Sequence, residues 1–163
     1  MQKVETQLQM QFSKLGLNKA STILILSTSR DYQFKKLSYK IYYEMYYPDS
    51  MIPFKDKTID VLVTTPDLAV NDQIVADGFR ILKNNGYLVL TGLSQNYILN
   101  RFHRKYPVQN KSYLARLIKN ANLKIVDSFN FGFYPRIFGF ICEKNLVEAV
   151  KIHDLVPLID NVI

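Results

Sequence analysis

The sequence is poor in the residues that disulfide scaffolds, collagen-like chains and metal sites require. It has one cysteine, Cys142, no tryptophan, and only six glycines and six prolines among 163 residues. A lone cysteine forms no internal disulfide and no paired-cysteine metal site, and so little glycine and proline excludes collagen-like and low-complexity chains. The two histidines, His103 and His153, lack cysteine or acidic partners at ligand spacing, so no metal site is predicted.

Long apolar runs are also missing. The longest apolar stretches are a few residues, far short of a membrane span, and residues 1–7 are polar and lack the apolar region of a signal peptide. We therefore expect a cytoplasmic protein without membrane contact. Hydrophobic residues at 48% and charged residues at 21% are ordinary for a folded globular chain, and the length predicts one domain over residues 1–163.

Acidic residues are absent from one strongly basic segment. The chain has 21 Lys and Arg against 14 Asp and Glu, a net charge of +7, and residues 101–124 contain seven basic residues and no acidic one. A local excess of positive charge favours anionic partners such as nucleic acid, and Arg101, Arg104, Lys105 and Lys111 are the candidate contacts. A helix face in water, with lysine stems over apolar surface, explains the same pattern without a partner.

Apolar spacing in the first third indicates a helix and two strands. An apolar residue at every third or fourth position predicts a helix within residues 1–18, which Gly16 would end. The apolar run 22–26 predicts a strand buried on both faces. A short helix is expected over 31–38, and aromatic residues at alternate positions predict a strand over 39–47.

The middle of the chain has the pattern of a βαβ unit. Apolar runs predict strands over 59–63 and 87–91, and apolar residues at helical spacing predict a helix over 71–83 between them. A turn is expected at 84–86, where Gly86 can adopt a positive φ. Short links between these elements predict two parallel strands joined by a right-handed crossover.

The last third repeats this pattern and ends in an apolar tail. A helix is predicted over 111–121 and strands over 123–127 and 137–142, which should be antiparallel because their link is too short for a helix. The apolar extension 145–163 is expected either to fold back on the core as a helix or to form a homo-oligomer contact.

Strands that alternate with helices predict an α/β three-layer sandwich, with a mostly parallel sheet, an antiparallel C-terminal strand and helices on both faces. In such sheets, ligands bind at the carboxyl ends of the strands, near the point where the strand order reverses.

Four segments resemble class I S-adenosylmethionine-dependent methyltransferases. Residues 52–62 resemble that family's approach to its fourth strand, and residues 79–90 resemble its helix exit and fifth strand. Residues 114–127 and 137–144 are similar to its last helix and its two final strands. The resemblance implies a Rossmann-like sheet, S-adenosylmethionine as cofactor, and methyl transfer to an unknown acceptor.

The first motif of the chain departs from that family. There, the first strand ends in an acidic residue and a glycine-rich turn, whereas this chain has Ile25 at the acidic position and Ser27, Ser29 and Asp31 at the glycine positions. Glycine lets the backbone approach a ligand closely. The resemblance thus assigns cofactor contacts to Ser27, Ser29 and Asp31 in a degenerate motif.

The N-terminal half of the predicted sheet is abbreviated. The 32 residues of segment 27–58 must hold what the family builds from two helices and two strands, whose mean lengths alone total about 32 residues. One βα pair is therefore expected to be shortened or missing. The resemblance makes Glu44 the candidate for the ribose hydroxyls and Asp49 the candidate for the adenine amino group. A carboxylate in water or paired with arginine is the alternative for Glu44.

The loop 64–67 is where the resemblance places the methyl acceptor. Methyl transfer from a sulfonium is an in-line displacement that needs positioning and desolvation more than a nucleophilic residue. Thr64 and Thr65 are the remaining candidate cofactor contacts, and Asp67 is the candidate to accept a proton or orient an amine. Alternatively, Asp67 caps the next helix or fixes the turn with Pro66.

Three interpretations remain open from the sequence. The first is an active methyltransferase, and the second is a catalytically inactive methyltransferase-fold module that binds an anionic partner or a second subunit. The third is a nucleotide-binding α/β domain of another family, matched only by shared sheet patterns.

Overall fold

The computed structural model describes residues 2–28, 39–45, 51–94, 107–132 and 136–144. These ranges contain three helices and seven strands. In chain order they are α1 (Gln2–Lys14), β1 (Thr22–Ser27), β2 (Lys40–Met45), β3 (Ile59–Thr64), α2 (Asp72–Ile81), β4 (Leu82–Ser94), β5 (Val108–Gln109), α3 (Lys111–Asn120), β6 (Leu123–Phe131) and β7 (Ile137–Lys144).

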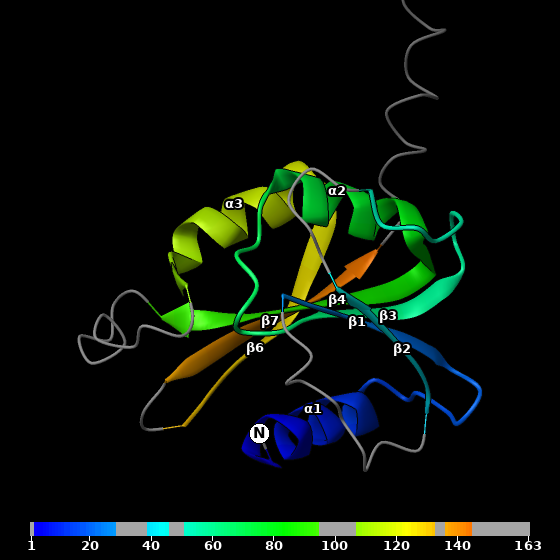
Figure 1. The fold of residues 1–163 in the computed structure, drawn as a ribbon, viewed down its shortest axis with the longest axis horizontal. Helices are drawn as coiled ribbons and strands as arrows, with labels where there is room; N and C mark the ends of the chain where they lie inside the picture. The colour runs from blue at the N-terminus through cyan, green and yellow to red at the C-terminus, as the bar shows by residue number, and fades with distance from the viewer. Residues whose placement is uncertain (1, 29–38, 46–50, 95–106, 133–135, 145–163) are drawn as a thin grey trace, which may run out of the picture.

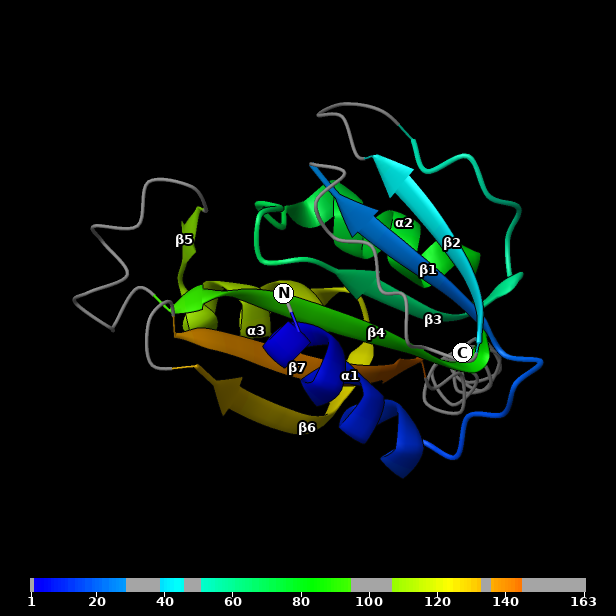
Figure 2. The ribbon, with the colours of Figure 1, turned by 60° about the horizontal axis from the view of Figure 1, so that its bottom comes forward.

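The strands form one mixed sheet in the order β2-β1-β3-β4-β7-β6 (Figures 1 and 2). Strands β2, β1, β3 and β4 run parallel, and β7 is antiparallel to both β4 and β6. The short strand β5 pairs in parallel with the end of β4 and had no signal in the sequence. The predicted α/β class and the antiparallel C-terminal strands are confirmed.

Helices cover both faces of the sheet, as predicted. Helix α1 lies on one face, and α2 and α3 lie on the other (Figure 1). Strand β1 shows why its apolar run is continuous: Leu24 and Leu26 pack into the core under α2 and α3, whereas Ile23 and Ile25 pack against Leu8 and neighbouring residues of the α1 side. None of the helices in the described ranges is long and apolar enough to cross a bilayer.

The N-terminal elements match their predicted positions. Helix α1 ends at Lys14, and Gly16 follows with a φ of +66°. Strand β2 occupies the centre of the stretch expected to be a strand, and between β1 and β3 it is the one strand that the described residues contain. The helix expected over 31–38 and the tail 145–163 lie outside the described residues, so the predicted tail contact stays a prediction.

The turn expected at 84–86 is wrong in its form. Strand β4 begins directly after α2, and the pairing shifts so that Ile59 faces Leu82 while Val61 faces Tyr87. The extra residues of β4 form a bulge in which Asn85, not Gly86, has the positive φ, at 63°. Asparagine tolerates this conformation better than most residues.

Gly86 serves a different purpose in the same bulge. A Cβ atom there would lie 2.9 Å from the carbonyl oxygen of Lys83 and 3.1 Å from that of Asp60. The residue is therefore glycine because the backbone segments approach each other closely.

Candidate functional site

The order of the strands reverses at β1. The chain passes from β1 to β2 on one side and later returns to β3 on the other side of β1. The carboxyl ends of β1 and β3 flank this topological switch point, which is where α/β sheets bind ligands. The residues gathered there are polar: Ser27, Thr28, Thr64, Thr65 and Asp67, hereafter the switch-point cluster.

Asp67 lies at the centre of the switch-point cluster. Its Oδ2 accepts hydrogen bonds from the Ser27 hydroxyl at 2.9 Å, the Thr28 backbone N–H at 3.0 Å and the Thr28 hydroxyl at 2.7 Å. Its Oδ1 is bonded to the Thr65 hydroxyl. Asp67 is only 8% exposed, and this set of donors compensates for the burial of its carboxylate.

Hydrogen bonds of Thr64, the last residue of β3, and of Thr65, which follows it, connect β1, β3 and β4. The Thr65 N–H donates to the carbonyl oxygen of Leu26 in β1 at 3.0 Å, and the Thr65 hydroxyl lies 2.9 Å from the same oxygen. The hydroxyl of Thr64 accepts from the N–H of Thr91 in β4 at 3.2 Å, and the Thr91 hydroxyl donates to the Thr64 carbonyl at 2.5 Å. The carboxyl ends of β1, β3 and β4 are thus fixed relative to one another.

These contacts locate some of the predicted site residues and leave others undescribed. The structure brings Ser27, Thr64, Thr65 and Asp67 together as the resemblance implied. Glu44 pairs in register with Leu26 in the adjacent strand, and so lies at the same edge of the sheet. Ser29, Asp31 and Asp49 lie outside the described residues.

The helix-capping alternative for Asp67 is wrong. The N-cap of α2 is Asn71, whose Oδ1 accepts from the N–H of Ile74 at 2.9 Å. Asp67 instead fixes the turn itself through Thr65, and joins that turn to β1 through Ser27 and Thr28. The other alternative, a turn-fixing role, thus describes the geometry.

Gln109 supports the same loop from the other side and was missed in the sequence. Its Nε2 donates to the carbonyl oxygen of Leu68 at 2.9 Å, and its Oε1 accepts from the N–H of Val70 at 3.4 Å. The amide passes over Gly92, where a Cβ atom would lie 2.8 Å from Nε2. One glutamine in a polar stretch carries no signal of such contacts, because its partners are about 40 positions away in the chain.

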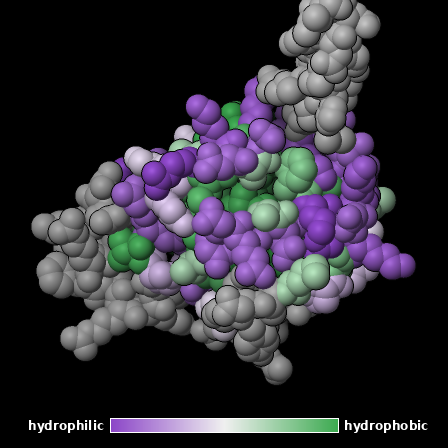
Figure 3. All heavy atoms as spheres, turned by 90° about the horizontal axis from the view of Figure 1, so that it is seen from above, coloured by the Kyte–Doolittle hydropathy of each residue, from purple (hydrophilic) through white to green (hydrophobic). Residues whose placement is uncertain are grey.

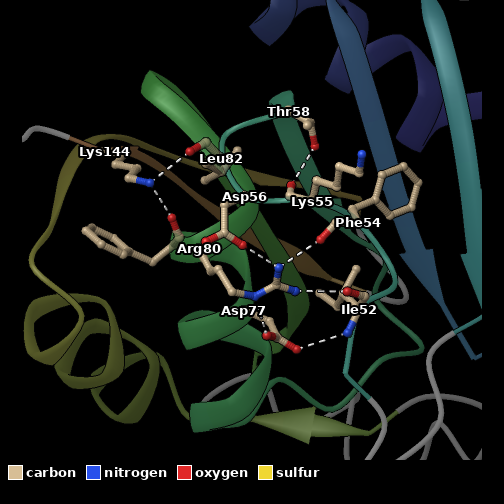
Figure 4. Close-up of polar contacts among 10 residues, drawn as sticks. Ile52, Phe54, Lys55, Asp56, Thr58, Asp77, Arg80, Leu82 and Lys144 are labelled. Atoms are coloured by element: carbon tan, nitrogen blue, oxygen red, sulfur yellow. Dashed lines mark hydrogen bonds and ion pairs between the residues drawn. The ribbon is translucent and has the colours of Figure 1, made fainter.

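A second polar cluster lies around Arg80 and fixes the segment that precedes β3 (Figure 4). The guanidinium donates to the carbonyl oxygens of Ile52 at 2.9 Å and Phe54 at 2.8 Å, and pairs with Asp56 at 2.8 Å and Asp77 at 3.2 Å. The hydrogen bond with Asp56 raises the pKa of Arg80. This arginine, which the family resemblance included, therefore has a structural role here.

Lys144 and Lys83 extend this structural network at the amino-terminal edge of β3. The buried amine of Lys144 donates to the carbonyl oxygens of Phe79 and Leu82 at the end of α2, and burial lowers its pKa. Lys83 pairs with Asp60 at 2.9 Å, and Asp60 also accepts from the N–H of Thr22. This charged edge is opposite the switch-point cluster, so it fixes the fold without contributing to the site.

Of the four basic residues predicted to contact an anionic partner, the structure describes one, Lys111. No group of side chains that could hold a metal ion occurs within the described ranges. Arg101, Arg104 and Lys105 lie outside those ranges. Lys111 donates to Asn130 at 2.8 Å and lies 5.1 Å from the centre of the Phe138 ring, and burial together with nearby Arg136 lowers its pKa.

Comparison with solved structures places the fold among S-adenosylmethionine-dependent methyltransferases. A methyltransferase from Methanosarcina mazei matches with a TM-score of 0.59 and 14% identity, covering 80% of this chain and 95% of that one. Geranyl diphosphate methyltransferase in complex with S-adenosylmethionine matches with a TM-score of 0.62 and 9% identity, over 86% and 85% of the two chains.

The same fold also occurs in an enzyme named for a different reaction. The [4+2]-cyclase SpnF matches with a TM-score of 0.63 and 11% identity, covering 88% of this chain and 82% of that one. No protein-family model matches the sequence, and no curated protein matches it. The chain therefore has the methyltransferase fold, which by itself does not fix a reaction.

Proposed function

We propose that this protein is an S-adenosylmethionine-dependent methyltransferase that binds its cofactor at the switch-point cluster. One observation carries the proposal: a polar cluster at the topological switch point of a sheet whose structural matches include a methyltransferase with S-adenosylmethionine bound. When bound, the cofactor supplies the electrophilic methyl group, and the acceptor is an unknown molecule.

Thr28 is the exposed member of the switch-point cluster, and its hydroxyl is bonded to the Asp67 carboxylate. A cofactor would therefore meet the cluster at this residue. Glu44, one strand away, is the proposed partner of the ribose hydroxyls, and Ser29, Asp31 and Asp49 remain proposed contacts. The rigid connection between β1, β3 and β4 would orient the ligand, which is what an in-line displacement requires.

Asp67 acts in this proposal as a positioning residue. Both of its oxygens already accept hydrogen bonds, from Ser27, Thr28 and Thr65. The proton-accepting role predicted from the sequence would require one of these bonds to break, whereas orienting the loop requires all of them.

The experiment is calorimetric titration with S-adenosylmethionine and S-adenosylhomocysteine. Thr28→Tyr places a bulky ring at the carboxyl end of β1. The control is Thr58→Tyr at the opposite edge, because Thr58 is an exposed threonine whose hydroxyl is also hydrogen-bonded within the protein. Binding that is lost in Thr28→Tyr and kept in Thr58→Tyr supports the site. Wild-type binding that is unaffected by Thr28→Tyr contradicts it.

A second function is favoured by one specific contact. The Thr28 N–H, which follows β1 where the family has its glycine-rich turn, donates to Asp67 and so is engaged within the protein. This arrangement suits a catalytically inactive methyltransferase-fold module. A folded wild-type protein whose melting temperature does not move with millimolar S-adenosylmethionine would favour the module, since any ligand of the native state stabilises it.

A further inference from the structure

The outer face of α3 concentrates positive charge around an exposed aromatic ring. Its apolar residues Leu114, Leu117 and Ile118 are buried against the sheet. The residues on the opposite side of the helix are exposed: Ser112, Tyr113, Arg116, Lys119 and Asn120. Because residues three and four apart share one side of a helix, these five form a continuous stripe.

This stripe carries no compensating negative charge. Helix α3 contains no acidic residue, and within the described part of the chain neither Arg116 nor Lys119 forms an ion pair. The Arg116 guanidinium lies 5.8 Å from the centre of the Tyr113 ring, and Tyr113 is 37% exposed. Positive charge and an exposed ring are therefore available together on one surface.

The positive field continues beyond the start of the helix. Arg136 is exposed and close enough to Lys111 to lower the pKa of its amine. On the same side of the molecule, hydrophilic side chains surround an apolar area (Figure 3). In sequence, Arg101, Arg104 and Lys105 belong to the same acid-free segment as α3.

Lys124 does not belong to this surface, although it belongs to the same basic segment. It pairs in register with Glu143, which faces Tyr87 across the β4–β7 pair, and Tyr87 packs against the core cluster on the α1 side. Its neighbour Leu123 packs into the core on the other side. Since side chains alternate along a strand, Lys124 points to the face opposite α3.

We propose that the outer face of α3 binds single-stranded nucleic acid. Arg116 and Lys119 would contact phosphates, and Tyr113 would stack on a base. Charge alone would suit any polyanion, but an exposed ring within a basic stripe is the combination that single-stranded nucleic-acid sites use. Helix α3 follows Gln109 and the N-cap Asn110, and Gln109 contacts Leu68 and Val70 in the loop after the switch-point cluster.

The inference goes beyond methyl transfer and does not depend on it, because binding is measured without cofactor. The assay is fluorescence anisotropy of labelled oligouridylate and oligodeoxythymidylate, each titrated at salt concentrations from about 50 to about 200 mM. Affinity that falls steeply with salt is expected, because bound cations are released from the phosphates.

Charge reversal tests whether binding depends on the α3 stripe or only on the net charge of the protein. Arg116→Glu with Lys119→Glu should weaken binding at least about tenfold and lower the salt slope by about 1.4, because each phosphate contact on a single strand contributes about 0.7. The control is Lys19→Glu with Lys124→Glu, two exposed residues outside the stripe whose reversal changes net charge equally. Equal losses in the two double variants would overturn the proposal.

Two further measurements distinguish nucleic acid from a general polyanion. Tyr113→Ala should weaken binding at least about fivefold, as expected for one stacked base, and leave the salt slope unchanged. Inorganic polyphosphate should compete poorly with wild-type binding. If it competes as well as an oligonucleotide of equal charge, or if Tyr113→Ala has no effect, the site is not specific for nucleic acid and the proposal fails.

Discussion

The backbone N–H of Thr28 donates a 3.0 Å hydrogen bond to Oδ2 of Asp67. The residue that follows β1 is thereby bound to the loop that follows β3, across the topological switch point of the sheet. In the resembling family, glycines in this turn let the backbone approach a ligand. Here the backbone of the turn is hydrogen-bonded to Asp67 instead. Whether S-adenosylmethionine binds at this hydrogen bond decides between the two proposed functions.

The first prediction concerns the carboxylate of Asp67. Asp67→Asn replaces one accepting oxygen by an NH₂ group that faces donors from Ser27, Thr28 or Thr65. We expect the free energy of unfolding to fall by about 1–3 kcal/mol, because buried donors lose their acceptor. Urea denaturation measures the change, and a loss below about 0.5 kcal/mol would show that the cluster is not held by this carboxylate.

The second prediction concerns the packing of Gln109 on Gly92. Gly92→Ala should displace the glutamine amide, and Gln109→Ala should leave the Leu68 carbonyl and the Val70 N–H without their partner. Each variant is expected to lose about 1–3 kcal/mol of stability. The double variant serves as the control, since residues in contact should give a loss smaller than the sum. Strict additivity would argue against the contact.

A third prediction compares two basic residues at the opposite edge. Arg80 donates to two backbone carbonyls and pairs with two carboxylates, whereas Lys83 forms one partly exposed pair with Asp60. Arg80→Ala should therefore lower the free energy of unfolding by about 2 kcal/mol or more, and Lys83→Ala by less than about 1 kcal/mol. Similar losses in the two variants would contradict the role given to Arg80.

A fourth prediction follows from Cys142. Burial raises the pKa of its thiol to about 12, from an ordinary value of 9.0. A group whose pKa is higher in the folded state stabilises the fold below its unfolded pKa, so this contribution is complete below pH 9 and is lost as the pH rises towards 12. A thiol reagent at pH 8 should thus label urea-unfolded protein rapidly and native protein slowly.

The alkaline loss of stability has its own control. Cys142→Ala removes the thiol but keeps Tyr87, whose pKa is also raised by burial, and Lys144, whose pKa is lowered. Between pH 9 and pH 11 the wild type should lose more stability than this variant, by up to about 1.4 kcal/mol for each pH unit. Parallel curves for the two proteins would show that the thiol ionises normally in the fold.

Most of the fold could be predicted because its signals are local. The apolar run of β1 is buried on both faces, and the positions of Ile74 and Val75 in the predicted helix report which side of α2 faces the sheet. Periodicity contains this information since neighbouring side chains point in fixed directions from a helix or strand. The bulge around Asn85 was missed because it depends on how β4 pairs with β3.

The contacts of the candidate site could be predicted only in part. The resemblance assigned Ser27, Thr65 and Asp67 to one site, and in the structure they lie at the same edge of the sheet. It did not indicate that their side chains bind one another, because these hydrogen bonds mostly join residues about 40 positions apart. Gln109 was missed for the same reason.

The most direct test of the central proposal is a titration of isotope-labelled protein with S-adenosylmethionine, followed by the backbone amide signals in NMR spectra. The account predicts saturable shifts concentrated at Thr28, Thr65 and Leu68, on either side of the switch point, with little change at the opposite edge around Lys83. Unchanged spectra at millimolar cofactor, or shifts concentrated away from the ends of β1 and β3, would contradict it.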